Sequence, residues 1–234
     1  MKIKTLVFLV LSPIVLLSVI IVLYLRQDVK SNWDSKTIAF IGDSITEQGM
    51  FEHKEYPKLV KKELGLSAIE NYGVGGSSFC VRNNEYDELY PPLVNRWESI
   101  EGADAFFILI GTNDYSSQVP FGKKESLDTS EFNGCLNIVL GGLKEKYPDS
   151  LIVVSTILKR KDNEVPVSLT KYNEVLKSKV EEFDLLLFDG YSIEDLDIGS
   201  DYEKAITKDR LHPNKNGARI LGGAVANYFE GIQN

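Results

Sequence analysis

Short apolar runs rich in β-branched and aromatic residues alternate along the chain with longer segments in which apolar residues recur every three or four positions. The short runs predict buried strands, and the longer segments predict amphipathic helices that cover them. This alternation predicts a three-layer α/β fold around a parallel sheet. The predicted strands are Thr37–Ile41, Ser67–Tyr72, Ala105–Ile110, Leu151–Ile157 and Leu185–Phe188. The predicted helices begin near Tyr56, Phe132, Leu169 and Asn214.

A different pattern, an unbroken apolar run, precedes the first predicted strand. Thr5–Leu25 carries no charged side chain, and a helix of this length can cross a bilayer core. Because signal peptides have shorter apolar regions and a small-x-small cleavage site, an uncleaved signal anchor is favoured over a cleaved leader. The sequence therefore predicts a transmembrane helix over residues 1–26, a linker over residues 27–35 and a folded domain over residues 36–234.

The charges on either side of the apolar run indicate an orientation. Lys2, Lys4 and the free amino terminus precede the run, whereas Arg26 and Lys30 follow it, with Asp28 between them. Positive charge favours the cytoplasmic side, so the slight excess before the run predicts an internal N-terminus. We therefore expect a single-pass protein of the cell membrane whose domain lies outside the cytoplasm.

The composition indicates a folded domain and argues against one class of partner. Hydrophobic residues make up 43% of the chain and charged residues 26%, which is close to globular averages. Four of the 26 basic and one of the 34 acidic residues fall within residues 1–30, which leaves 22 and 33, a net charge of −11, for the rest. A field of this sign repels phosphate backbones, so no nucleic-acid partner is expected.

Few side chains are available for metal or thiol chemistry. The two cysteines, Cys80 and Cys135, are too few for a disulfide scaffold or a four-thiolate zinc site, and we expect two unpaired, partly buried thiols. Of the two histidines, His53 lies in a polar stretch typical of a solvated surface. His212 is therefore the histidine to consider for chemistry.

Polar and glycine residues gather directly after the predicted strands, where parallel sheets bind ligands. Ser44 follows the first strand, a glycine-rich turn containing Gly76 follows the second, and Asn113 follows the third. Asp209 precedes His212 by three residues, just before the last predicted helix. An acidic side chain can fix the tautomer of an imidazole, which can then take the proton of a serine hydroxyl. Backbone N–H groups and an asparagine amide can stabilise an oxyanion, so the set predicts acyl transfer.

Four motifs in this order, GDSI, NYGVGGSS, GTND and DRLHP, closely resemble those of the GDSL or SGNH hydrolase family of esterases and acylhydrolases. The likeness runs from about Thr37 to Phe229. It implies a flavodoxin-like, five-stranded parallel sheet with strand order 2-1-3-4-5. The first motif of the family most often ends in Leu, where this chain has Ile45, a conservative departure.

The resemblance also implies a role for each matching residue. Ser44 would be the nucleophile and the first oxyanion donor, with Gly76 and Asn113 as the other donors and Asp209 and His212 completing the triad. The adjacent Gly75 stays an alternative to Gly76 as the second donor.

On this basis the sequence predicts a membrane-anchored serine esterase that needs no cofactor and no metal ion. A domain outside the membrane favours an O-acetyl or other short-acyl ester of a cell-surface glycan as the substrate. The stretch 115–130 is expected to overhang the site and is mostly polar, which favours a small or polar substrate. The alternatives are a lipase or phospholipase acting on longer-chain lipid esters, and a non-catalytic surface module that binds a glycan or a protein.

Overall fold

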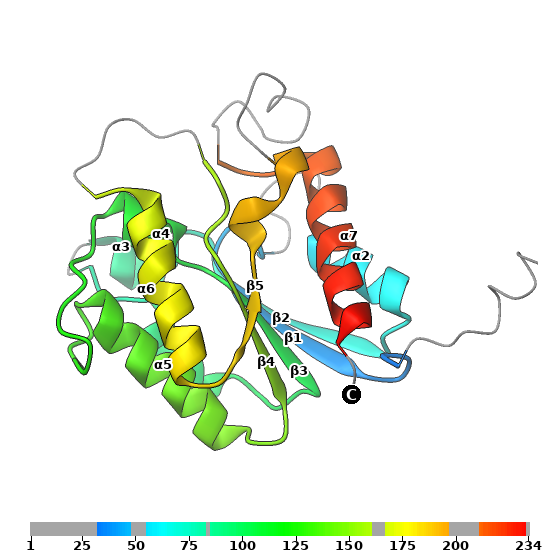
Figure 1. Cartoon of the computed structure of the whole chain (residues 1–234), viewed down its shortest axis with the longest axis horizontal. Coiled ribbons are helices and arrows are strands. Elements are labelled where there is room, and N and C mark those ends of the chain that lie inside the picture. Colours follow the sequence, from blue (N-terminus) through cyan, green and yellow to red (C-terminus); the bar gives the residue numbers. More distant parts are fainter. Residues whose placement is uncertain (1–31, 48–54, 83–84, 161–166, 197–210, 233–234) are drawn as a thin grey trace, which may run out of the picture. The chain divides into compact units, whose positions relative to one another are not determined.

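The computed structural model describes residues 32–47, 55–82, 85–160, 167–196 and 211–232 (Figure 1). One compact unit spans Trp33–Asn234 and is built on a five-stranded sheet of order β2-β1-β3-β4-β5, in which every neighbouring pair is parallel. The strands are β1 (Thr37–Gly42), β2 (Ala68–Gly73), β3 (Ala105–Leu109), β4 (Leu151–Ser155) and β5 (Leu186–Phe188). The α-helices are α2 (Tyr56–Leu64), α3 (Glu85–Leu89), α4 (Thr112–Ser116), α5 (Phe132–Lys146), α6 (Leu169–Glu182) and α7 (Lys215–Gly231). Short 3-10 helices are η1 (Leu93–Asn95), η2 (Trp97–Ser99), η3 (Gly190–Ser192) and η4 (Glu194–Leu196).

The sheet is buried on both faces because successive residues of its central strands enter different cores. In β3, Phe106 and Ile108 belong to the core that contains the apolar side chains of α5 and α6. Phe107 and Leu109 belong to a second core, which contains the apolar side chains of α2 and α7. Figure 1 shows α5 and α6 on one side of the sheet and α2 and α7 on the other, which makes a three-layer fold.

The register of the central strands brings three chain segments to one edge of the sheet. Gly42, the last residue of β1, pairs with Gly73 of β2 and with Leu109 of β3. The segments that follow these strands therefore start side by side. A Cβ atom on Gly42 would lie 2.1 Å from Thr46 Oγ1 and 2.6 Å from the Leu109 carbonyl oxygen, so only glycine allows the chain to fold back here.

The strand positions and the sheet order agree with the sequence predictions, but the predicted fold class needs a correction. That class included a transmembrane helix over residues 1–26, and no helix in the described ranges is long and apolar enough to cross a membrane. The apolar residues of α2, α5, α6 and α7 are confined to the side that covers the sheet, because the opposite side faces water. Residues 1–26 themselves lie outside the described ranges.

Packing extends into the stretch that the sequence predicts as a linker. Trp33 is only 2% exposed, and its indole Nε1 donates a hydrogen bond to the Phe229 carbonyl oxygen at 2.6 Å. The two rings meet edge to face with centroids 4.9 Å apart. The chain just before β1 is therefore held against the end of α7.

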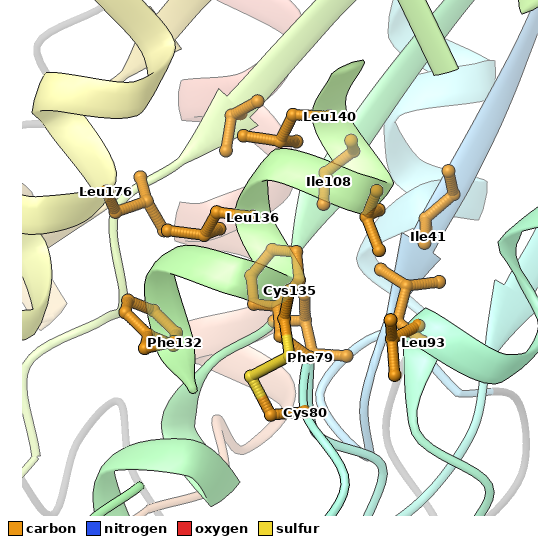
Figure 2. Close-up of a cluster of buried hydrophobic side chains, with 14 of the residues drawn as sticks. Ile41, Phe79, Cys80, Leu93, Ile108, Phe132, Cys135, Leu136, Leu140 and Leu176 are labelled. Carbon is orange, nitrogen blue, oxygen red and sulfur yellow. A yellow bond between two sulfur atoms is a disulfide. The ribbon is translucent and has the colours of Figure 1, made fainter. Parts of the chain in front are cut away.

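The two cysteines are joined, so the expectation of unpaired thiols is wrong. Cys80 and Cys135 form a disulfide with a Cα–Cα distance of 5.5 Å. Figure 2 shows the bond within the buried cluster, next to Phe79 and Phe132. The two residues are 55 positions apart and meet only because the segment after β2 packs against the first turn of α5. Sequence spacing carries no signal of such a contact.

Candidate active site

Ser44 lies in a tight turn at the carboxyl end of β1. The N–H groups of Thr46 and Glu47 donate to the Asp43 carbonyl oxygen at 3.0 and 2.9 Å. The N–H of Ile45 donates to Asp43 Oδ1 at 3.0 Å. These bonds hold the partly buried Ser44 at the carboxyl edge of the sheet, where parallel sheets bind ligands.

His212 reaches the same place from the other end of the domain. It precedes α7, whose N-cap Asn214 accepts hydrogen bonds from two backbone N–H groups of the first turn at 2.8 and 3.1 Å. Ser44 Oγ and His212 Nε2 lie 2.8 Å apart, although 168 residues separate them in the chain. This is hydrogen-bond distance between a hydroxyl and an imidazole nitrogen. Asp209 lies outside the described ranges.

The glycine-rich turn after β2 is tied to the end of β1. The Val74 N–H donates to the Gly42 carbonyl oxygen at 3.1 Å, and the Ser77 N–H donates to the Val74 carbonyl oxygen at 3.0 Å. Gly76 has a φ of +72°, and a Cβ atom there would lie 2.9 Å from the ring of Tyr90. Both the backbone conformation and the close contact require glycine at this position.

Asn113 joins this turn from the third strand. It lies in the first turn of α4, and its Nδ2 donates to the Ser77 carbonyl oxygen at 2.8 Å. The structure therefore brings Ser44 together with His212, and Asn113 together with the turn that contains Gly76.

A partly buried arginine, Arg96, supports this edge of the sheet, and the sequence motifs did not reveal it. Arg96 donates to the carbonyl oxygens of Tyr72 and Gly42 at 2.9 and 3.0 Å, and to Ser77 Oγ at 3.2 Å. It thus joins the ends of β1 and β2. Burial lowers the pKa of Arg96 to about 10 and raises the pKa of Asp43, which is 1% exposed, to about 7. No local pattern marks Arg96, because its partners are mostly backbone carbonyls far away in the sequence.

Asp114 positions the segment that leads from the glycine turn to the disulfide. Its two carboxylate oxygens accept hydrogen bonds from the N–H groups of Phe79 and Cys80 at 2.8 and 3.0 Å. The side chain is fully buried, and this burial raises the pKa of Asp114 to about 7. Asp114 therefore fixes the backbone behind the site, next to Asn113.

This raised pKa predicts a pH dependence of stability. An unfolded chain releases the Asp114 proton near pH 4 and the folded chain near pH 7, so between these values the folded state holds one more proton. The contribution of Asp114 to the free energy of unfolding is therefore lost as the pH rises through this window. We expect the free energy of unfolding of the wild type, relative to that of Asp114→Asn, to fall by about 2 kcal/mol between pH 5 and pH 7. Urea unfolding of both proteins at these pH values measures this change. If the difference between their unfolding free energies did not depend on pH, the raised pKa of Asp114 would be contradicted.

A hollow opens beside Ser44 and His212. It holds about 360 Å³ of empty space, part of it open to solvent, and its lining also includes Ile45, Glu47 and Tyr56. A second hollow of about 250 Å³ shares Ile45 and is lined mainly by apolar side chains. Typical ligand pockets range from about 300 to 1,000 Å³, so the first volume, which includes open solvent, lies near the lower end of this range and the second lies below it.

The part of the chain that the structure describes contains no group of three or more histidine, cysteine, aspartate or glutamate side chains that could hold a metal ion. His53 lies outside the described ranges. That the enzyme needs no cofactor or metal ion stays a prediction from the sequence.

Comparison with known proteins supplies the identity that the geometry suggests. Residues 40–220 match the GDSL-like Lipase/Acylhydrolase family. The chain belongs to this family. It is therefore an ester-hydrolysing enzyme, and the matched segment includes all five residues that the sequence predicts for the site. None of the curated proteins matches the chain.

Solved structures share the fold of this GDSL-like acylhydrolase. A protein from Lactobacillus plantarum is 21% identical, with a TM-score of 0.73, and the match covers 86% of this chain and 99% of that one. A possible lipase from Chitinophaga pinensis is 19% identical, with a TM-score of 0.66 and coverages of 83% and 98%. An acetylxylan esterase from Geobacillus stearothermophilus is 24% identical, with a TM-score of 0.62 and coverages of 86% and 97%. At these identities the likeness shows the fold alone.

Proposed function

We propose that this enzyme is a serine esterase in which Ser44 attacks the ester carbonyl. His212 takes the serine proton as a general base and then, as a general acid, gives it to the departing alcohol. Asp209 orients His212 in this proposal. The observation that carries it is the distance of 2.8 Å between Ser44 Oγ and His212 Nε2.

The negative charge that develops on the carbonyl oxygen needs hydrogen-bond donors. We assign this role to the backbone N–H groups of Ser44 and Gly76 and to the side-chain amide of Asn113, with Gly75 as the alternative to Gly76. Asn113 Nδ2 carries two N–H donors, of which one binds the Ser77 carbonyl oxygen. That bond holds the amide in a fixed orientation, so little reorganisation is needed when the oxyanion forms.

The preferred substrate in this proposal is an O-acetyl or other short-acyl ester of a glycan. The second hollow supports a short acyl group, because it is lined mainly by apolar side chains and also by Asp43 and Ile45, the two neighbours of Ser44. Large exposed hydrophobic side chains in the described ranges are Tyr86, Leu89 and Leu127, which is little apolar surface for a long lipid chain. The acetylxylan esterase with the same fold acts on an acetylated glycan, as its name states. Longer-chain lipid esters are the alternative substrates.

We also propose that the domain works outside the cytoplasm. The Cys80–Cys135 disulfide supports this location, because disulfides persist in oxidising compartments and are rare in the reducing cytosol. Acylated glycans of the cell surface would be within reach of the enzyme there.

A series of 4-nitrophenyl esters with acyl chains of two to eight carbons tests the acyl preference. We expect kcat/KM to be highest for acetyl and to fall by at least about tenfold towards eight carbons, because longer chains exceed the space beside Ser44. A preference for eight carbons would contradict the short-acyl proposal and favour the lipid alternative.

A further inference from the structure

Glu47 has a buried oxygen atom that the fold does not use. Its side chain lines the same hollow as Ser44 and His212. Oε2 of Glu47 is buried, yet it has no hydrogen-bond partner among the residues that the structure describes. A carboxylate oxygen that is buried without a partner costs folding free energy, so most native proteins avoid it except where it serves a function.

The backbone of Glu47 is held firmly in place. Its N–H donates to the Asp43 carbonyl oxygen at 2.9 Å. The preceding residue, Thr46, accepts a hydrogen bond from Asn71 Nδ2 at 2.8 Å. A Cβ atom on Gly73 would lie 2.4 Å from the Glu47 nitrogen, so the end of β2 packs directly against this backbone. The Glu47 side chain is therefore attached to a rigid backbone, in the same turn as Ser44.

The mechanism decides which half of an ester lies near Glu47. His212 must give its proton to the departing alcohol oxygen, which therefore lies within hydrogen-bond reach of His212 Nε2. Because His212 and Glu47 line one hollow, the alcohol half of the substrate enters the space that both side chains border. A carboxylate only accepts hydrogen bonds, so it suits an alcohol that carries a further donor.

We propose that Glu47 is a specificity-determining residue whose carboxylate turns from its buried position into the hollow and accepts a hydrogen bond from a free hydroxyl group on the alcohol half of the ester. This inference rests on the proposed function and narrows its substrate class. The favoured substrates are partially acylated sugars or other polyols that keep a free hydroxyl near the ester. Glu47 takes no part in bond making or breaking; it orients the alcohol through a charge-assisted hydrogen bond.

Two matched substrates test the inference: a methyl glucoside with one acetyl group and free ring hydroxyls, and the same ester with those hydroxyls methylated. The readout is the ratio of their kcat/KM values. We expect the wild type to favour the free hydroxyls by about ten- to hundredfold, which is the value of a hydrogen bond to a charged group. In Glu47→Met, which keeps the volume but removes the acceptor, the ratio should fall to within about threefold of unity.

Three further variants give the test its controls. Glu47→Gln keeps an acceptor oxygen and should retain part of the preference, whereas Glu63→Ala, which removes an exposed carboxylate from α2, should keep all of it. Because the buried oxygen is unpaired, Glu47→Met should fold at least as stably as the wild type, and thermal unfolding checks this.

The outcomes separate the inference from the proposed function. An unchanged ratio in Glu47→Met overturns the inference, provided that Ser44→Ala is inactive on both substrates. A loss in Glu63→Ala as large as in Glu47→Met also overturns it, because the preference would then not depend on a carboxylate that borders the hollow. If Ser44→Ala kept the wild-type rates, the proposed function would fail whatever ratio the Glu47 variants gave.

Discussion

Replacing Ser44 by alanine is expected to lower kcat for 4-nitrophenyl acetate by about ten-thousandfold or more, while the fold stays intact. The hydroxyl lies 2.8 Å from His212 Nε2, so its removal takes away both the nucleophile and the proton that the imidazole accepts. Ser44 is partly exposed at the end of a turn that backbone bonds hold, and the loss of one oxygen atom leaves that turn unchanged. Steady-state kinetics and circular dichroism measure the two effects.

The matched control is Ser168→Ala, because Ser168 is an exposed serine before α6 that bonds to Thr170 through its hydroxyl. It should keep wild-type activity. A fluorophosphonate probe supplies a second readout: it should label the wild type and Ser168→Ala but not Ser44→Ala. Labelling of Ser44→Ala at the wild-type rate would show that another residue is the nucleophile.

Replacing His212 by alanine should lower kcat about as much as Ser44→Ala does, again by roughly ten-thousandfold. Without the imidazole, the serine proton has no acceptor in the attack and the departing alcohol has no donor. The sharper result concerns the double variant Ser44→Ala with His212→Ala. Residues that act as a unit are not additive, so the double variant should be no slower than either single variant.

The control for this cycle is His53→Ala, which removes the other histidine in the sequence and should leave kcat within about threefold of the wild type. The result that contradicts the pairing is additivity, in which the double variant loses the product of the two single effects. Such a result would mean that the two side chains act independently, despite their distance of 2.8 Å.

Much of the fold follows from local patterns in the sequence. The run Ala105–Leu109 is apolar on every residue, which suits a strand that is buried on both faces, and β3 has this burial throughout. Periodic apolar stripes likewise place α5, α6 and α7, because a helix that covers a sheet buries only one side. The predicted fold class also included a transmembrane helix, and this part was wrong, because no helix in the described ranges is long and apolar enough to cross a membrane.

The residues that support the site show the limit of such patterns. Arg96 binds the carbonyl oxygens of Tyr72 and Gly42, 24 and 54 positions away, and no short motif encodes these contacts. The same is true of Asp114, which binds backbone N–H groups 34 and 35 positions away. The Cys80–Cys135 bond is of the same kind, since the two thiols meet only when the segment after β2 packs on α5. The unpaired oxygen of Glu47 is even harder to predict from the sequence, because it depends on neighbouring groups not lying within hydrogen-bond distance.

The sequence by itself determined the order along the chain of the five strands and the four longer helices, the acidic charge of the domain, and the candidates Ser44, Gly76, Asn113, Asp209 and His212. These depend on residue type and spacing within short windows, which local conformational preferences convert directly into structure. Only the tertiary structure decided that Ser44 Oγ and His212 Nε2 lie 2.8 Å apart, that the cysteines are paired and that Glu47 borders the same hollow. Such contacts join residues that are distant in the chain, so they exist only once the helices have packed on the sheet.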